Sequence, residues 1–319
     1  MKLILSFLLL ICSAVIGIRR HRSSAAAHEE AKDAFKVVKK WIQRKHLELT
    51  LPKNGEIFEG DIVMSPLLRR AVLNKYSKRS ALVEADHKWP GGIVPYELDS
   101  SLPNIILSSI GRAMREYHKF TCIRFVRRTN QKDFVLFRSK RHVCSSSVGR
   151  IGGQQNITLG PGCYRLGTEL HEMMHALGVV HEQSRPDRDN HVNVIMNNVD
   201  PKYLHNFQKY EFNDITDLSV PYNFASIMHY RNSAFSKNGE ETLVSIRFPS
   251  LRFGQRKMFS EGDIAQINRL YNCDTKEKKI EQVYRLSKKL GIEEDTEIIP
   301  NAFDVVGDST LTDEYNFNF

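Results

Sequence analysis

Residues 171–189 read HEMMHALGVVHEQSRPDRD, and this stretch is the most informative part of the chain. His171 and His175 are four residues apart, so in a helix their imidazoles lie on one face, one turn apart. Gly178 follows three residues later and His181 three after that, and a glycine can turn the chain so that the third imidazole returns to the same point. The spacing predicts a metal site made by three histidines at the end of a helix.

Three protein ligands are typical of a catalytic zinc site. Zn2+ held by three histidines keeps an open position for water, and zinc lowers the pKa of that water towards neutrality. Glu172 is placed to take the proton from this water and pass it to the leaving amine. A zinc ion that only stabilises the fold is the alternative, but it gives no role to Glu172. We expect a Zn2+-dependent endopeptidase with protein or peptide substrates.

The motif extends into a family pattern. Residues 171–189 closely resemble the astacin signature HExxHxxGxxHExxRxDRD, one branch of the metzincin proteases, and the SIMHY sequence of residues 226–230 resembles the Met-turn SxMHY of that family. The resemblance covers residues 80–273. It implies an α+β fold with two lobes around a cleft: an N-terminal lobe with a twisted, mostly antiparallel sheet and two helices, and a less regular C-terminal lobe. It also implies that a stretch near residues 150–159 is the edge strand that aligns the substrate.

The resemblance also assigns roles to single residues. Met228 would form the hydrophobic floor beneath the imidazoles, and Tyr230 would be a further zinc ligand that swings aside to stabilise the oxyanion. Glu182 would form a buried ion pair with the new α-ammonium group of Ser80 after processing. From spacing alone, Met228 and Tyr230 are ordinary core residues, so their roles depend on the family.

A second motif lies upstream of the protease-like region. Residues 58–61, FEGD, resemble the FxGD motif through which astacin prosegments block their enzymes, and Asp61 would coordinate zinc in place of the catalytic water. Without that context Asp61 is equally well an exposed turn residue. Further along, Lys78 and Arg79 precede Ser80, so we expect an activating protease to cut after Arg79.

The ends of the chain differ in composition from its middle. Lys2 and an apolar run before Arg19 predict a signal peptide over residues 1–17, and therefore a secreted, extracellular protein without a membrane anchor. Residues 18–79 would be the inhibitory prosegment and residues 80–273 the protease domain. Residues 274–319 form a tail that becomes acidic, which we expect to be flexible.

The net charge of +9 suggests that the protein binds polyanions such as nucleic acid. Residues 18–79 carry 15 Lys or Arg against 7 Asp or Glu, whereas residues 80–319 carry 30 of each. A processed protein would have no net attraction for polyanions, so we expect no nucleic-acid partner. Two rivals to an enzyme remain: a polyanion-binding protein, which would retain heparin affinity after processing, and a zinc-containing binding protein that has lost catalysis.

The cysteines predict two disulfides. Removal of a signal peptide removes Cys12 and leaves four cysteines in an oxidising compartment. Three pairings are open, and spacing favours a local bridge from Cys144 to Cys163 with a long-range one from Cys122 to Cys273. The resemblance implies the same pairing.

Two further sites are hypotheses from the sequence. Asn156 begins the sequon Asn-Ile-Thr, which makes it a candidate for glycosylation. Several astacins prefer acidic residues after the cut, and Arg256 lies where such a family member would place the basic residue that selects them. Ordinary surface solvation explains Arg256 equally well.

Periodicity predicts most of the regular elements. Helices are expected at residues 25–49, 103–117 and 167–177, and in a short closing segment where Ser260 and Asp263 resemble a capping box. Strands are expected within residues 89–98, 122–126 and 134–137.

Overall fold

The computed structural model describes residues 51–73, 87–100, 102–140, 142–210 and 220–273, with a few helical residues between Glu29 and Lys39. The chain from Pro52 onward forms one compact unit and Met1–Leu51 another. Within Met1–Leu51, exposed helical residues form i,i+3 ion pairs, such as that of Lys32 with Glu29 at 3.5 Å. They agree with the predicted helix over residues 25–49, most of which lies outside the described residues.

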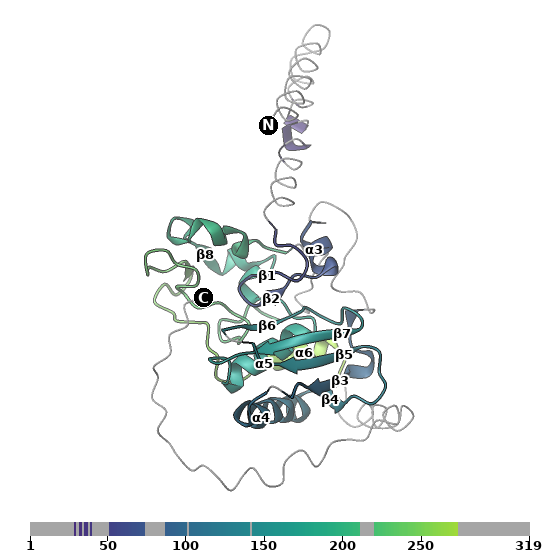
Figure 1. Ribbon diagram of the computed structural model, residues 1–319. Helices are drawn as coiled ribbons and strands as arrows, with labels where there is room; N and C mark the ends of the chain where they lie inside the picture. The colour runs from purple at the N-terminus through teal and green to yellow at the C-terminus, as the bar shows by residue number, and fades with distance from the viewer. Residues whose placement is uncertain are drawn as a thin grey trace, which may run out of the picture. The chain divides into compact units, whose positions relative to one another are not determined.

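Seven strands form the main sheet, in the order β1-β2-β6-β7-β5-β3-β4 (Figure 1). Their bounds are β1 Ile57–Phe58, β2 Ile62–Val63, β3 Ile93–Leu98, β4 Arg124–Arg127, β5 Phe134–Arg138, β6 Cys144–Ser146 and β7 Gln154–Leu159. A two-stranded ribbon joins β8 Val192–Val194 to β9 Leu243–Ser245. The strands predicted within residues 89–98, 122–126 and 134–137 are β3, β4 and β5.

The unit that begins at Pro52 has four described helices: α3 Pro66–Leu73, α4 Asn104–Phe120, α5 Leu166–Ala176 and α6 Glu261–Leu270. Sequence periodicity predicts α4, α5 and α6. Short 3-10 helices connect the remaining segments: η3 Pro90–Gly92, η4 Glu182–Ser184, η5 Arg188–Asn190, η6 Met196–Asn198 and η7 Pro201–Phe207. Within the described residues, no helix is both long and apolar enough to cross a membrane.

The α+β class is confirmed, but the expected strand direction is wrong. Within the main sheet as described, pairs β2–β6, β3–β4, β3–β5 and β5–β7 are parallel, whereas β1–β2 and β6–β7 are antiparallel. The reason is visible along the chain, because the 17 residues of α4 cross from β3 to β4 and a helical crossover returns the chain in the same direction.

The predicted edge strand is also wrong. Residues 154–159 form β7, which lies inside the sheet, between β5 and β6. β6 would be the edge on that side if β2 were absent, because β2 pairs with it through Ile62 and Ser146. The upstream segment therefore adds a strand to the sheet of the protease-like region.

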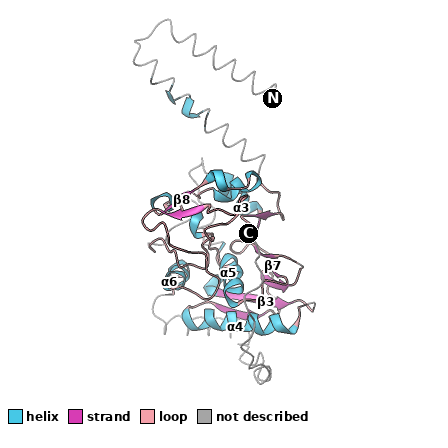
Figure 2. Ribbon diagram, turned by 90° about the vertical axis from the view of Figure 1, so that its left-hand side faces the viewer, coloured by secondary structure: helices cyan, strands magenta, loops and turns pink. Residues whose placement is uncertain are grey.

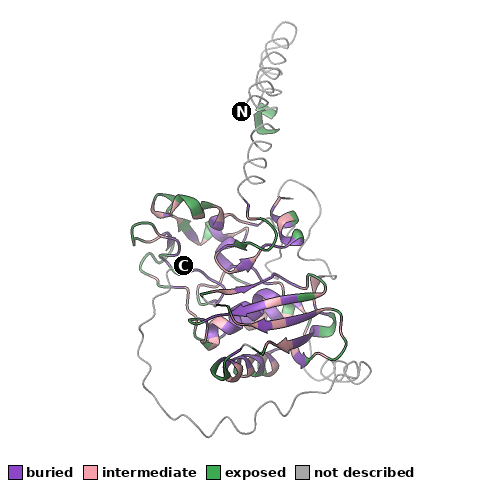
Figure 3. Cartoon of the chain, in the orientation of Figure 1, coloured by how far each residue is buried: buried purple, intermediate pink, exposed green. Residues whose placement is uncertain are grey.

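One hydrophobic core fixes the helix that carries the histidines. Side chains of α4, α5, the sheet and α6 share this core, and Figure 3 marks buried residues along the strands of the sheet. Tyr117 of α4 donates its hydroxyl to the carbonyl of Leu170, at 2.7 Å, one residue before His171. The long-range disulfide between Cys122 and Cys273 joins the end of α4 to the end of α6.

The region around β8 and β9 has a smaller hydrophobic core of its own, which includes Val192, Phe207 and Leu243. Residues around β8 and β9 contain short 3-10 helices and loops, and lie at the opposite end from α4 within the unit that begins at Pro52 (Figure 2). Buried polar side chains brace these loops; Arg188, for example, donates to the carbonyls of Gln183 and Phe207, each at 3.0 Å. This half agrees with the expected irregular C-terminal lobe.

Candidate active site

Helix α5 and the loop after it bring three imidazoles together. His171 and His175 lie one turn apart on α5 and are buried. Gly178 follows the helix with φ +105°, a conformation that suits glycine, and its N–H donates to the carbonyl of His175 at 2.8 Å. The chain then returns His181, also buried, to the other two rings.

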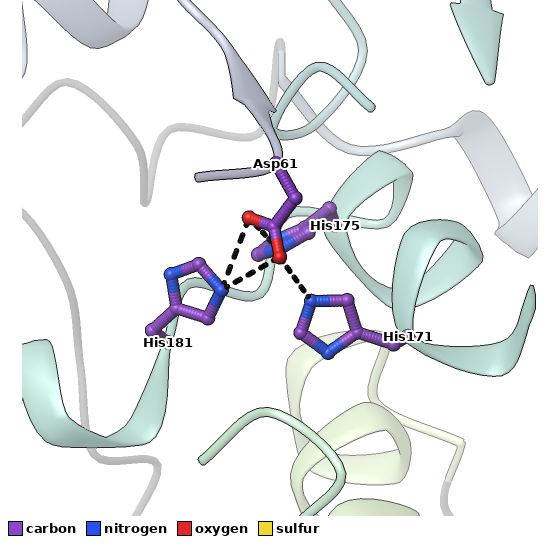
Figure 4. A group of neighbouring side chains, drawn as sticks. All are labelled: Asp61, His171, His175 and His181. Carbon is purple, nitrogen blue, oxygen red and sulfur yellow. Dashed lines mark hydrogen bonds and ion pairs between the residues drawn. The ribbon is translucent and has the colours of Figure 1, made fainter. Parts of the chain in front are cut away.

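Asp61 points into the centre of these rings from the turn between β1 and β2 (Figure 4). Its carboxylate lies 3.0 Å from Nε2 of His171, 3.2 Å from Nε2 of His181 and 3.5 Å from Nε2 of His175. One ligand atom from each of the four residues lies within 4.8 Å of the others. Burial alone would raise the pKa of Asp61, but the imidazoles outweigh it and hold that pKa well below its usual range.

The hydrogen bonds of the imidazoles indicate a cation at the centre. Nδ1 of His171 faces the carbonyl of Ile227 and Nδ1 of His175 faces that of Val179, both at 2.8 Å, so each Nδ1 carries the proton. Burial lowers the pKa of both rings, so each is neutral and turns the lone pair of Nε2 toward the Asp61 carboxylate. The Nε2 lone pairs and the carboxylate oxygens are all acceptors and repel one another unless a metal ion lies between them and binds both. The site therefore fits Zn2+, which prefers imidazole and carboxylate ligands.

Glu172 lies beside the histidines and has one free oxygen. The residue is buried, and its Oε2 has no hydrogen-bond partner in the part of the chain that the structure describes. Burial, with the nearby Asp61 charge, raises its pKa well above the usual range. Glu172, Asp61, Tyr230 and Arg256 line one cavity. The arrangement places a proton acceptor next to a metal site within that cavity.

Comparisons with known proteins identify the family of this chain. The family model described as Astacin, a peptidase family, matches residues 81–272. The chain belongs to the astacin family. It is 42% identical to zinc metalloproteinase nas-4 of Caenorhabditis elegans, over 70% of this chain and 71% of that protein. It is 39% identical to zinc metalloproteinase nas-13 of the same worm, over 68% of this chain but only 50% of that relative.

A solved structure supports the same conclusion. High choriolytic enzyme 1, a hatching enzyme zinc-protease from Oryzias latipes, matches with a TM-score of 0.55 and 42% identity, over 58% of this chain and 93% of that one. As a member of the astacin family, the protein is a zinc metalloendopeptidase, and zinc is its metal.

The remaining positions of the astacin pattern surround the site. Met228 is fully buried in the core that contains α5. The ring of Tyr230 lies 4.6 Å from that of His181, but its hydroxyl donates to the carbonyl of Glu59, at 2.6 Å. The phenol is therefore engaged by the upstream segment. The roles predicted for Met228 and Tyr230 stay predictions.

Glu182 already has partners in this astacin chain. Its carboxylate accepts from Arg185 Nη1 at 3.1 Å and from the backbone N–H of Asn223 at 2.7 Å. Burial raises its pKa to about 7. Ser80 and Arg79, which the predicted maturation involves, lie outside the described residues.

The structure also describes the predicted disulfides, the predicted glycosylation site and Arg256. The disulfides join Cys122 to Cys273 and Cys144 to Cys163, as predicted. Asn156 is half-buried on β7. Arg256 lies in the wall of the active-site cavity and donates to the carbonyl of His229 at 3.0 Å.

Two residues of the site were missed by sequence reasoning. Glu59 contacts Nδ1 of His181 at 2.7 Å, although spacing gave no reason to separate it from any exposed acid. Asp263, interpreted only as part of the capping box, also accepts from Ser226 Oγ at 2.5 Å and from the N–H of Ile227 at 3.2 Å. It thereby anchors the turn whose carbonyl orients His171. The burial of Asp263 is visible only in the folded chain, so the sequence carried no signal for this second role.

Proposed function

We propose that this protein is a secreted zinc endopeptidase made as an inactive precursor, with His171, His175 and His181 as zinc ligands and Glu172 as the catalytic base. The observation that carries the proposal is the Asp61 carboxylate, which lies among three buried imidazoles at 3.0 to 3.5 Å from their Nε2 atoms. A carboxylate in that place excludes water and substrate from the metal.

The chemistry follows from the side chains around the zinc. The bound ion would supply a Lewis acid that polarises the scissile carbonyl and acidifies water. Glu172 accepts the proton of the attacking water on its free Oε2 and delivers it to the leaving amine nitrogen. A pKa raised by burial suits both halves of this transfer, because the carboxyl group can hold the proton between them.

Tyr230 would act after the prosegment leaves. Release of the Glu59 carbonyl frees the phenol to donate to the negative oxygen that develops on the scissile carbonyl. The substrate would then add as a strand to β6, the edge that β2 covers in the precursor. This replaces residues 150–159 as the proposed substrate-aligning strand.

Maturation would proceed in two cuts. Removal of residues 1–17 accompanies secretion, and a cut after Arg79 releases the prosegment, residues 18–79, from the protease domain, residues 80–273. The new α-ammonium group of Ser80 would pair with Glu182, whose buried carboxylate is held at present by Arg185. Residues 274–319 remain as a tail, and Asn156 and Arg256 keep their proposed roles in glycosylation and in selecting acidic substrates.

One experiment separates an enzyme from a zinc-binding protein. Protein processed at Ser80 is mixed with quenched fluorescent casein, with and without a zinc chelator, beside Glu172→Ala. Cleavage that the chelator stops and the variant lacks supports the proposal. No cleavage by correctly processed, zinc-loaded protein contradicts it.

A further inference from the structure

We infer that Glu59 is a second inhibitory residue of the prosegment: its carboxylate orients the imidazole of His181, so that zinc and prosegment hold each other in the precursor. This inference rests on the proposed zinc site and adds to it a positioning residue, which acts on the metal through a ligand.

The three imidazoles differ in what orients them. His171 and His175 use Nδ1 to contact the backbone carbonyls of Ile227 and Val179, which belong to the protease domain. Nδ1 of His181 instead contacts Oε2 of Glu59, 122 residues earlier in the chain, at 2.7 Å. Two zinc ligands therefore keep their orienting partners after processing, and the third loses its partner.

The contact is part of a closely fitted arrangement. Glu59 and His181 are both almost completely buried, and Ser184 Oγ lies 3.4 Å from the other oxygen of Glu59. The backbone of Glu59 donates to Asn206 Oδ1 at 3.1 Å and accepts from the Tyr230 hydroxyl. Its φ of +51° is a left-handed conformation that a non-glycine residue adopts at a cost. These contacts fix both the backbone and the carboxylate of Glu59.

A charged acceptor changes the imidazole more than a carbonyl does. A carboxylate that accepts the Nδ1 proton makes Nε2 a more basic ligand and holds the ring in place, and removal of such a partner typically weakens metal binding by roughly 10- to 100-fold. The precursor should therefore bind zinc more tightly than the processed enzyme, and by thermodynamic reciprocity zinc should tighten the hold of the prosegment.

A residue just before β1 provides a matched control. Glu56 lies three residues before Glu59 and is exposed, and its carboxylate accepts from the backbone N–H of Lys53 at 2.7 Å. Glu56→Gln removes one negative charge from the prosegment without touching His181, whereas Glu59→Gln removes it at the imidazole while keeping the size of the side chain.

Zinc affinity of the unprocessed full chain provides the first test. Competition with a chromophoric chelator at constant pH is expected to show about tenfold weaker binding for Glu59→Gln and no change for Glu56→Gln. NMR of chain labelled with 15N-histidine gives the second readout: the Nδ1–H signal of His181 should move upfield in Glu59→Gln, while those of His171 and His175 stay in place. A merely structural role would not move one ring signal selectively.

The outcomes separate the two proposals. Unchanged zinc affinity and an unmoved His181 signal in Glu59→Gln, or equal zinc affinity of precursor and processed enzyme, overturn the role of Glu59. A wild-type chain that binds no zinc overturns the proposed zinc site itself. If Glu59→Gln does not fold, Glu59→Asp replaces it, because the shorter acid keeps the charge but withdraws it from Nδ1, and zinc affinity should fall in the same way.

Discussion

Helix α5 and the turn between β1 and β2 both bring carboxylates to the same three histidines, but these carboxylates differ in their hydrogen bonds and in their pKa values. Asp61 and Glu59, from the turn, lie 2.7 to 3.5 Å from imidazole nitrogens. Glu172, from the helix, has an oxygen without a hydrogen-bond partner among the described residues. The pKa of Asp61 is lowered by the imidazoles, whereas that of Glu172 is raised by burial. In the proposed function, the paired carboxylates would hold the site closed and the unpaired one would be available for proton transfer.

The largest effect should come from the free carboxylate. Glu172→Gln in the processed enzyme removes the proton acceptor and should lower kcat by up to about 10⁴-fold, with zinc binding preserved, since general acid–base catalysis contributes about 10² to 10⁴. Peptide hydrolysis and zinc content are measured together. Glu169→Gln, three residues earlier on α5, is the control and should leave kcat within a few-fold. Equal losses in both variants would mean that the helix, and not the free oxygen, matters.

Removal of the Tyr230 hydroxyl, which donates to the carbonyl of Glu59 in this structure, should have the next largest effect. Tyr230→Phe in the processed enzyme removes one donor to the developing oxyanion, so kcat should fall about 10²- to 10³-fold with little change in KM. Steady-state kinetics with a peptide substrate measure both constants, and Tyr203→Phe serves as control in the same lobe. A change confined to KM would assign Tyr230 to substrate binding instead.

A second buried carboxylate on α5 extends the comparison to stability. Glu169 Oε1 has no hydrogen-bond partner among the described residues, Oε2 accepts from Ser109, and burial raises the pKa to about 7. The folded state therefore holds a proton that the unfolded state loses above about pH 4.5, so stability should fall as pH rises from about 4.5 to 7.

Glu169→Gln removes that dependence. At pH 8 the variant should be more stable than the wild type by up to about 3 kcal/mol, and near pH 4 the difference should vanish. Chemical denaturation of the unprocessed chain at both pH values measures this. A variant that is less stable at pH 8 would show that Ser109 compensates fully for the buried charge.

Removal of the Asp61 charge should have the smallest effect on activity. Asp61→Asn removes the negative charge among the imidazoles, so the unprocessed chain should gain basal peptidase activity, on the order of tenfold, because an amide is a weaker zinc ligand than a carboxylate. Initial rates before any cut at Arg79, checked by mass spectrometry, measure it. Glu56→Gln should stay latent. A latent Asp61→Asn chain would assign the block to β2 and to Glu59.

The sequence predicted helix α5 and the loop after it better than it predicted the neighbours of the strands. The i,i+4 spacing and Gly178 predicted the helix, its end and the return of His181, because helical geometry is local. The capping box at Ser260 was predicted for the same reason. Strand neighbours were not predicted, because the pairing of β7 with β5 on one side and β6 on the other is decided only by the folded sheet. The helical crossover through α4 could have predicted parallel pairing.

By itself, therefore, the sequence determined the ligand types, the helix that presents two of them and the pairing of the cysteines. Glu172 was predicted from its motif and Asp61 from the family resemblance, but only the tertiary structure decided that Glu59 also reaches the site. Asp61 and Glu59 lie 110 and 122 residues before the histidines they contact, and nothing in their spacing separates them from the exposed Glu56. Local geometry is set by neighbours along the chain, whereas burial and hydrogen-bond partners depend on packing between distant segments, here the addition of β2 to the sheet.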